Sequence, residues 1–153
     1  MATIEDIYAA LIKEGVRREL HVVPEFCVTP KTRLFEKKID VAWLRQRDDS
    51  VRVGSLRRWK IVAAFEIEGY DVSLDRLRMH SEQFQHLWAD EDNFPCFVPL
   101  YTQAFHRVNP DWGNRNLAAK IQQHVNKACS LGSVIQVKDG RNLDWVLNIP
   151  DGT

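Results

Sequence analysis

The chain has 153 residues and no net charge at neutral pH, with 44% hydrophobic and 27% charged residues. This length fits one domain spanning residues 1–153, and this balance is typical of a globular protein rather than a disordered one. No stretch approaches the roughly 20 apolar residues of a membrane-spanning helix. The acidic, amphipathic start is unlike a signal or transit peptide. We therefore expect a cytoplasmic protein without a membrane partner.

A helix followed by three strands is expected in the first half of the chain. The helix should begin after Thr3, because apolar residues then recur at helical spacing until Gly15 stops the pattern. Three runs rich in apolar side chains predict the strands: residues 19–28, 39–44 and 60–67. Pro24 indicates an edge position or a bulge in the first strand. The third run, KIVAAFEI, is the most apolar and is typical of a central strand covered on both faces.

The second half begins with a helix that Ser73 can cap, with Leu77 and Phe84 on its inward face. Three further elements are expected: a strand over 96–101, a helix that opens at Asn114 or Asn116, and a hairpin of 134–137 and 143–149 around Asp139-Gly140. The whole order predicts an α/β or α+β domain with a mixed central sheet flanked by helices.

Three carboxylates stand where the expected strands could bring them together. Glu66 and Glu68 point to the same face if their strand runs through Glu68. Asp40 lies on the preceding strand, and consecutive strands are often neighbours. Such a cluster is stabilised by a divalent cation, and Mg²⁺ prefers oxygen ligands and phosphate oxygens. The alternative is that the two glutamates leave the core for solvent or pair with Arg57 or Arg58.

Basic residues concentrate in one part of the chain. Residues 31–60 contain ten Lys or Arg residues and four acidic ones. A local excess of positive charge of this kind can contact phosphates. A solvated loop and strand surface would have the same composition, so both interpretations stay open.

The order of elements and the spacing of the acids resemble the PD-(D/E)XK superfamily, the restriction-endonuclease-like nucleases. The core of that family, α-β-β-β-α-β, is similar to the order expected over about residues 3–101, which leaves about 102–153 as a C-terminal extension. Asp40 in KKIDVAW resembles the family's aspartate, and Glu66 in IVAAFEIEG the first acid of its (D/E)-x-K motif. Glu5, ten residues before Gly15, matches an acid that many relatives carry early in the first helix.

The segment SLDRLRMHSEQF resembles a family pattern of L-x-R-L followed by a glutamine and an aromatic residue. Arg76, His80 and Gln83 form an i, i+4, i+7 stripe there and are candidates for contacts with a substrate phosphate. His80 stands where the resemblance places the glutamine. The structural alternatives are a surface salt bridge for Arg76 and a surface or boundary position for His80.

Two positions depart from the family pattern: Ile39 replaces a proline, and Glu68 stands where a lysine is expected. A glutamate cannot supply the positive charge of that lysine. Three alternatives follow. The Glu-x-Glu site is active and relies more on metal, or an arginine, Arg76 being the best candidate, supplies the charge in space. In the third, the site is degenerate and binds nucleic acid or a partner protein without cutting.

The resemblance implies an endonuclease that hydrolyses phosphodiester bonds in DNA with Mg²⁺ or Mn²⁺. Asp40, Glu66 and Glu68 would be its metal ligands, with Glu68 also able to orient the attacking water. Glu5 would orient a second metal through water. Because relatives often dimerise to cut two strands, the resemblance also implies a homodimer. The chain has no glycine-rich phosphate loop, so no nucleotide cofactor is expected.

Overall fold

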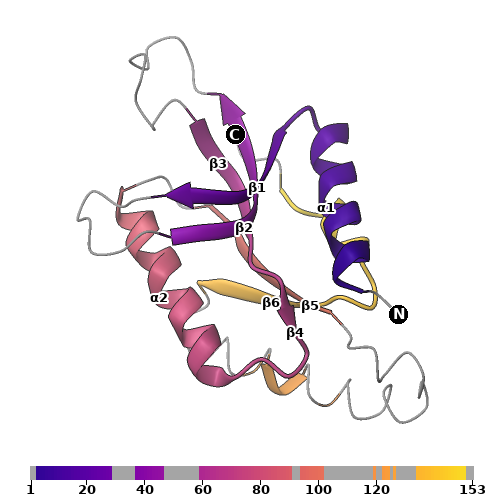
Figure 1. The fold of residues 1–153 in the computed structure, drawn as a ribbon, viewed down its shortest axis with the longest axis vertical. Helices are drawn as coiled ribbons and strands as arrows, with labels where there is room; N and C mark the ends of the chain where they lie inside the picture. Colours follow the sequence, from indigo (N-terminus) through magenta and orange to yellow (C-terminus); the bar gives the residue numbers. More distant parts are fainter. Residues whose placement is uncertain are drawn as a thin grey trace.

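The computed structural model describes residues 3–28, 37–46, 59–90, 94–101, 119, 122–124, 126 and 134–150. It shows the predicted mixed α/β architecture, with α1 and α2 on opposite sides of a central sheet (Figure 1). The elements follow in the order α1 (Ile4–Arg17), β1 (His21–Val28), β2 (Lys37–Gln46), β3 (Trp59–Phe65), β4 (Glu68–Gly69), α2 (Leu74–Asp90), β5 (Cys96–Tyr101), β6 (Ile135–Asp139) and α5 (Asp144–Leu147).

The described strands form one six-stranded mixed sheet. The strands β1, β2 and β3 are antiparallel neighbours, whereas β5 pairs in parallel with β3, β4 and β6. In the strand order β1 stands at the end of the sheet, as Pro24 predicted. Residues 61–65 of β3 are all buried, which confirms the prediction of a central strand covered on both faces.

Each face of the sheet has its own layer of buried apolar side chains. On the side of α1 the layer includes Ile7, Leu11, Trp43, Phe65 and Phe97. On the side of α2 it includes Ala42, Leu44, Leu77, Phe84 and Cys96. Full burial of one large apolar side chain stabilises a fold by about 1.5–3 kcal/mol. The two layers therefore hold both helices firmly against the strands that carry the predicted acids.

The predicted start of α1 is confirmed, but its predicted end is wrong. Thr3 Oγ1 accepts a hydrogen bond from the Asp6 amide at 3.2 Å, and the Asp6 carboxylate accepts one from the Thr3 amide at 2.9 Å. The helix then continues through Gly15 to Arg17. A Cβ on Gly15 would lie 2.4 Å from a methyl carbon of Val22 and 2.8 Å from Trp43 Nε1. Gly15 therefore allows close packing inside the helix instead of ending it.

The start of α2 is also confirmed, because Ser73 Oγ accepts a hydrogen bond from the Arg76 amide at 3.2 Å. For the third expected helix, residues 119, 122–124 and 126 are helical, while Asn114 and Asn116 lie outside the described residues. None of the described helices is long and apolar enough to span a membrane.

The predicted C-terminal hairpin is wrong. Its first strand exists as β6, but α5 follows in place of the second strand. Gly140 donates its amide to the Leu100 carbonyl at 3.0 Å, and a Cβ there would lie 2.1 Å from that oxygen. The absence of a side chain at Gly140 therefore allows its backbone to lie close to the backbone of β5. Val146 and Ile149 are buried three residues apart, a helical spacing, and Arg18 donates to the Ile149 carbonyl at 2.6 Å.

Candidate functional site

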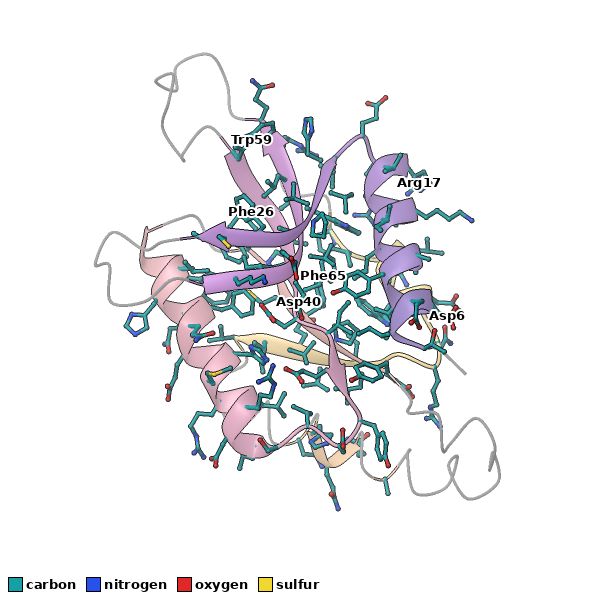
Figure 2. The ribbon with its side chains drawn as sticks, in the orientation of Figure 1. Asp6, Arg17, Phe26, Asp40, Trp59 and Phe65 are labelled. Atoms are coloured by element: carbon teal, nitrogen blue, oxygen red, sulfur yellow. The ribbon has the colours of Figure 1, made fainter. Side chains whose placement is uncertain are left out.

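Asp40 lies on β2 beside the point where β3 ends. Its Oδ2 accepts a hydrogen bond from the Ile67 amide at 2.9 Å, and the neighbouring Glu66 amide donates to the Phe97 carbonyl at 2.9 Å. The carboxylate thus accepts a hydrogen bond from a backbone amide at the point where the pairing of β2 with β3 ends. Figure 2 places Asp40 near the middle of the molecule, close to Phe65. The structure therefore brings Asp40 next to the Glu66-Ile67 peptide.

The two glutamates do not lie on one continuous strand, because β3 ends at Phe65 and β4 begins at Glu68. Both nevertheless approach the same side chain on α2. His80 Nε2 is 2.8 Å from Glu68 Oε1, and His80 Nδ1 is 4.0 Å from Glu66 Oε2. The exposed fractions are 2% for the His80 side chain, 4% for Glu66 and 12% for Glu68. The glutamates thus face α2, and the histidine between them is buried and not at the surface.

Arg76 contacts Glu68 from the outer side. Its Nε donates to the same Glu68 Oε1 that His80 approaches, while 55% of the arginine side chain stays exposed. Burial raises the pKa of Glu68, but the hydrogen bonds from His80 and Arg76 and their charges outweigh it, so this pKa lies below its ordinary value. Glu68 is consequently ionised at neutral pH. Positive charge stands beside the position where the family resemblance places a lysine.

Tyr8 lies on α1 and packs against the apolar layer on that side of the sheet. Burial raises the pKa of Tyr8, and the charges of Asp40, Glu25 and Glu66 raise it further. Its hydroxyl therefore stays protonated and can donate a hydrogen bond near the site. Glu25, which no sequence motif singled out, has a φ of 52° and forms an ion pair with Lys38 at 3.3 Å.

The remaining predicted site residues lie further out on the helices. Glu5 is exposed in the first turn of α1, one turn before Tyr8. Gln83 is partly buried on α2, one turn after His80. Most of the basic residues in the range 31–60 lie outside the described residues.

Metal binding can be judged from the acids themselves. Within the part of the chain that the structure describes, no three His, Cys, Asp or Glu side chains form a group that could hold a metal ion. Glu68 binds Arg76 and His80 instead. Mg²⁺ is commonly bound by one or two carboxylates together with waters and substrate phosphates. Asp40 and Glu66 carry the type of oxygen ligand that this smaller set needs.

No protein-family model matches the chain, and comparison with curated proteins and with solved structures gives no match. The assignment of a function therefore depends on the geometry of the site.

Proposed function

We propose that the chain is a restriction-endonuclease-like, Mg²⁺-dependent nuclease that hydrolyses phosphodiester bonds in DNA. The observation that carries the proposal is the hydrogen bond from the Ile67 amide to Asp40. It brings Asp40 on β2 next to the Glu66-Ile67 peptide at the end of β3, and a divalent cation would offset the repulsion between the two acids. The order from α1 to β5 supports the same fold class.

Asp40 and Glu66 would hold the ion, which when bound supplies a water of lowered pKa and neutralises charge on the leaving oxygen. The chain's own groups prepare this arrangement. The Ile67 amide orients the Asp40 carboxylate, and the hydrogen bond of the Glu66 amide to β5 fixes the backbone that carries Glu66. Glu68 is ionised and can accept a proton from the attacking water.

Arg76 is the residue of this chain best suited to contact a phosphate. Its guanidinium lies against Glu68, and more than half of its side chain is exposed. Arginine forms charge-assisted hydrogen bonds to phosphate oxygens through its remaining donors. We propose that it supplies the positive charge that the missing lysine would have provided.

The nuclease proposal is tested with purified protein, Mg²⁺ or Mn²⁺, and supercoiled, linear, branched and single-stranded DNA. Asp40→Asn keeps an oxygen that can accept from the Ile67 amide but removes the negative charge. Glu66→Gln removes the second charge, and Glu82→Gln, at an exposed position on α2, is the matched control.

We expect Asp40→Asn and Glu66→Gln each to lower cleavage by more than about 100-fold. Loss of a residue that only hydrogen-bonds to a metal ligand already lowers metal affinity or activity by about 10–100-fold, and loss of a ligand itself should cost more. The control should cleave like the wild type. Cleavage that persists in both site variants, or no cleavage of any of these DNA forms by the wild type, refutes the proposal.

A second candidate is a catalytically degenerate nuclease fold that binds nucleic acid or a partner protein. The observation that favours it is that Glu68 already binds Arg76 and His80, so the third acid is engaged within the protein. Isothermal calorimetry with Mn²⁺ and gel-shift assays with DNA separate the candidates. DNA binding without Mn²⁺ binding and without cleavage supports the degenerate module.

A further inference from the structure

His80 occupies a position between Glu66 and Glu68 that neither an ordinary core residue nor a phosphate ligand explains. Its Nε2 is within hydrogen-bond distance of Glu68, at 2.8 Å, while its Nδ1 faces Glu66 at 4.0 Å. The two nitrogens lie on different sides of one rigid ring. The imidazole therefore acts as a spacer with one carboxylate on each side.

The helix holds this ring in place. His80 lies in the interior of α2, and its helical neighbours Leu77 and Phe84 are fully buried against the sheet. An apolar residue would be the ordinary choice on such a face, because a buried polar group is unfavourable unless it has a hydrogen-bond partner. The hydrogen bond to ionised Glu68 satisfies that requirement.

The same contact restricts the acids. A glutamate side chain has several rotatable bonds, and a fixed partner selects one conformation. Glu68 is held by His80 from the helix and by Arg76 from the outer side. Glu66 is buried, and its Oε2 lies 4.0 Å from His80 Nδ1. The ring thereby limits where the Glu66 carboxylate can lie at the end of β3.

We propose that His80 is a positioning residue that sets the separation of Glu66 and Glu68 and holds the Glu66 carboxylate at the end of β3, the strand that pairs with β2 and its Asp40. This inference rests on the proposed function, since it assigns His80 a role in preparing the Asp40–Glu66 pair for a divalent cation. Residues that orient metal ligands typically contribute 10–100-fold to metal affinity or activity. His80 is buried, so we assign the contact with a substrate phosphate to the exposed Arg76 instead.

Two substitutions separate positioning from simple core packing. His80→Gln puts a side-chain nitrogen near the position of Nε2, so it can still donate a hydrogen bond to Glu68. His80→Asn is one methylene shorter and cannot reach Glu68. The matched control is Ser81→Ala, which also removes a buried polar group from α2. If His80→Asn does not fold, His80→Met, which has no donor, takes its place.

Mn²⁺ affinity by calorimetry and steady-state DNA cleavage are measured for all variants, with thermal unfolding as the check on folding. His80→Asn is expected to weaken Mn²⁺ binding and lower kcat by 10–100-fold while KM for DNA stays unchanged. His80→Gln should restore most of the loss, and Ser81→Ala should behave like the wild type. An absent loss, or a loss that glutamine does not restore, overturns the inference.

Crystal structures of the wild type and His80→Asn test the same inference without activity. The Glu66 carboxylate should change its distance from Glu68 in the variant, and an unchanged position overturns the positioning role. A wild type that neither binds Mn²⁺ nor cleaves DNA refutes the proposed nuclease instead. The structural comparison still decides whether His80 holds the two glutamates.

Discussion

Glu14 at the end of α1 provides a quantitative test of the ion pairs in this fold. Only 4% of the residue is exposed, and its carboxylate accepts hydrogen bonds from Arg17 at 3.0 Å and from Arg18 at 2.9 Å. The bonds from Arg17 lower the pKa of Glu14 most, burial opposes them, and with Arg18 they bring it from 4.5 to about 2. Arg18 also binds the Ile149 carbonyl, so this network joins α1 to the C-terminal segment.

The magnitude follows from that pKa. A fall from 4.5 to about 2 corresponds to about 3 kcal/mol, at about 1.4 kcal/mol per pKa unit. Because 66% of the Arg17 side chain is exposed, solvent screens that pair, and we expect about 2 kcal/mol. A lowered pKa in the folded state means that this stability is present above pH 4.5. It is lost as the pH falls from about 4.5 to about 2.

Urea unfolding of the wild type and Glu14→Gln at several pH values between 7 and 3 measures this contribution. At pH 7 the variant should be less stable by about 2 kcal/mol or more, since buried Arg18 also loses its charged partner. The difference should shrink as the pH falls below about 4.5, because Glu14 of the unfolded wild-type chain then binds a proton that the folded chain does not. Glu82→Gln, at an exposed position on α2, controls for loss of an acid elsewhere. A difference that is the same at pH 7 and pH 3 refutes the reasoning.

Gly140→Ala should lower the free energy of unfolding by about 2–3 kcal/mol, because the added carbon would lie 2.1 Å from the Leu100 carbonyl oxygen. Urea denaturation with no measurable loss would contradict this close approach. Thr3→Ala should cost about 1 kcal/mol through loss of the helix cap, whereas Thr3→Ser should retain most of it, and equal stability of both variants would argue against the cap. Arg76→Gln should raise the pKa of Glu68, since the arginine helps to lower it; an NMR titration that finds no rise contradicts the ion pair.

Local signals predicted most elements because their causes lie within a few residues. The hydroxyls of Thr3 and Ser73 cap helices through amides three residues away. The run of β3 predicted burial on both faces because its apolar side chains follow one another without polar alternation. The predictions from Gly15 and Gly140 were wrong. Each glycine allows a close contact with a distant segment, whereas the sequence suggested a helix end and a hairpin turn.

The same division applies to the candidate site. The sequence by itself predicted that Asp40 lies on one strand and Glu66 at the end of the next, because apolar runs are local signals. The structure confirms that these two strands, β2 and β3, pair. Only the tertiary structure decided that the chain leaves β3 at Glu66, and that His80 is buried between two glutamates. Those arrangements depend on hydrogen bonds and ion pairs between separate elements, and no periodicity within one element encodes them.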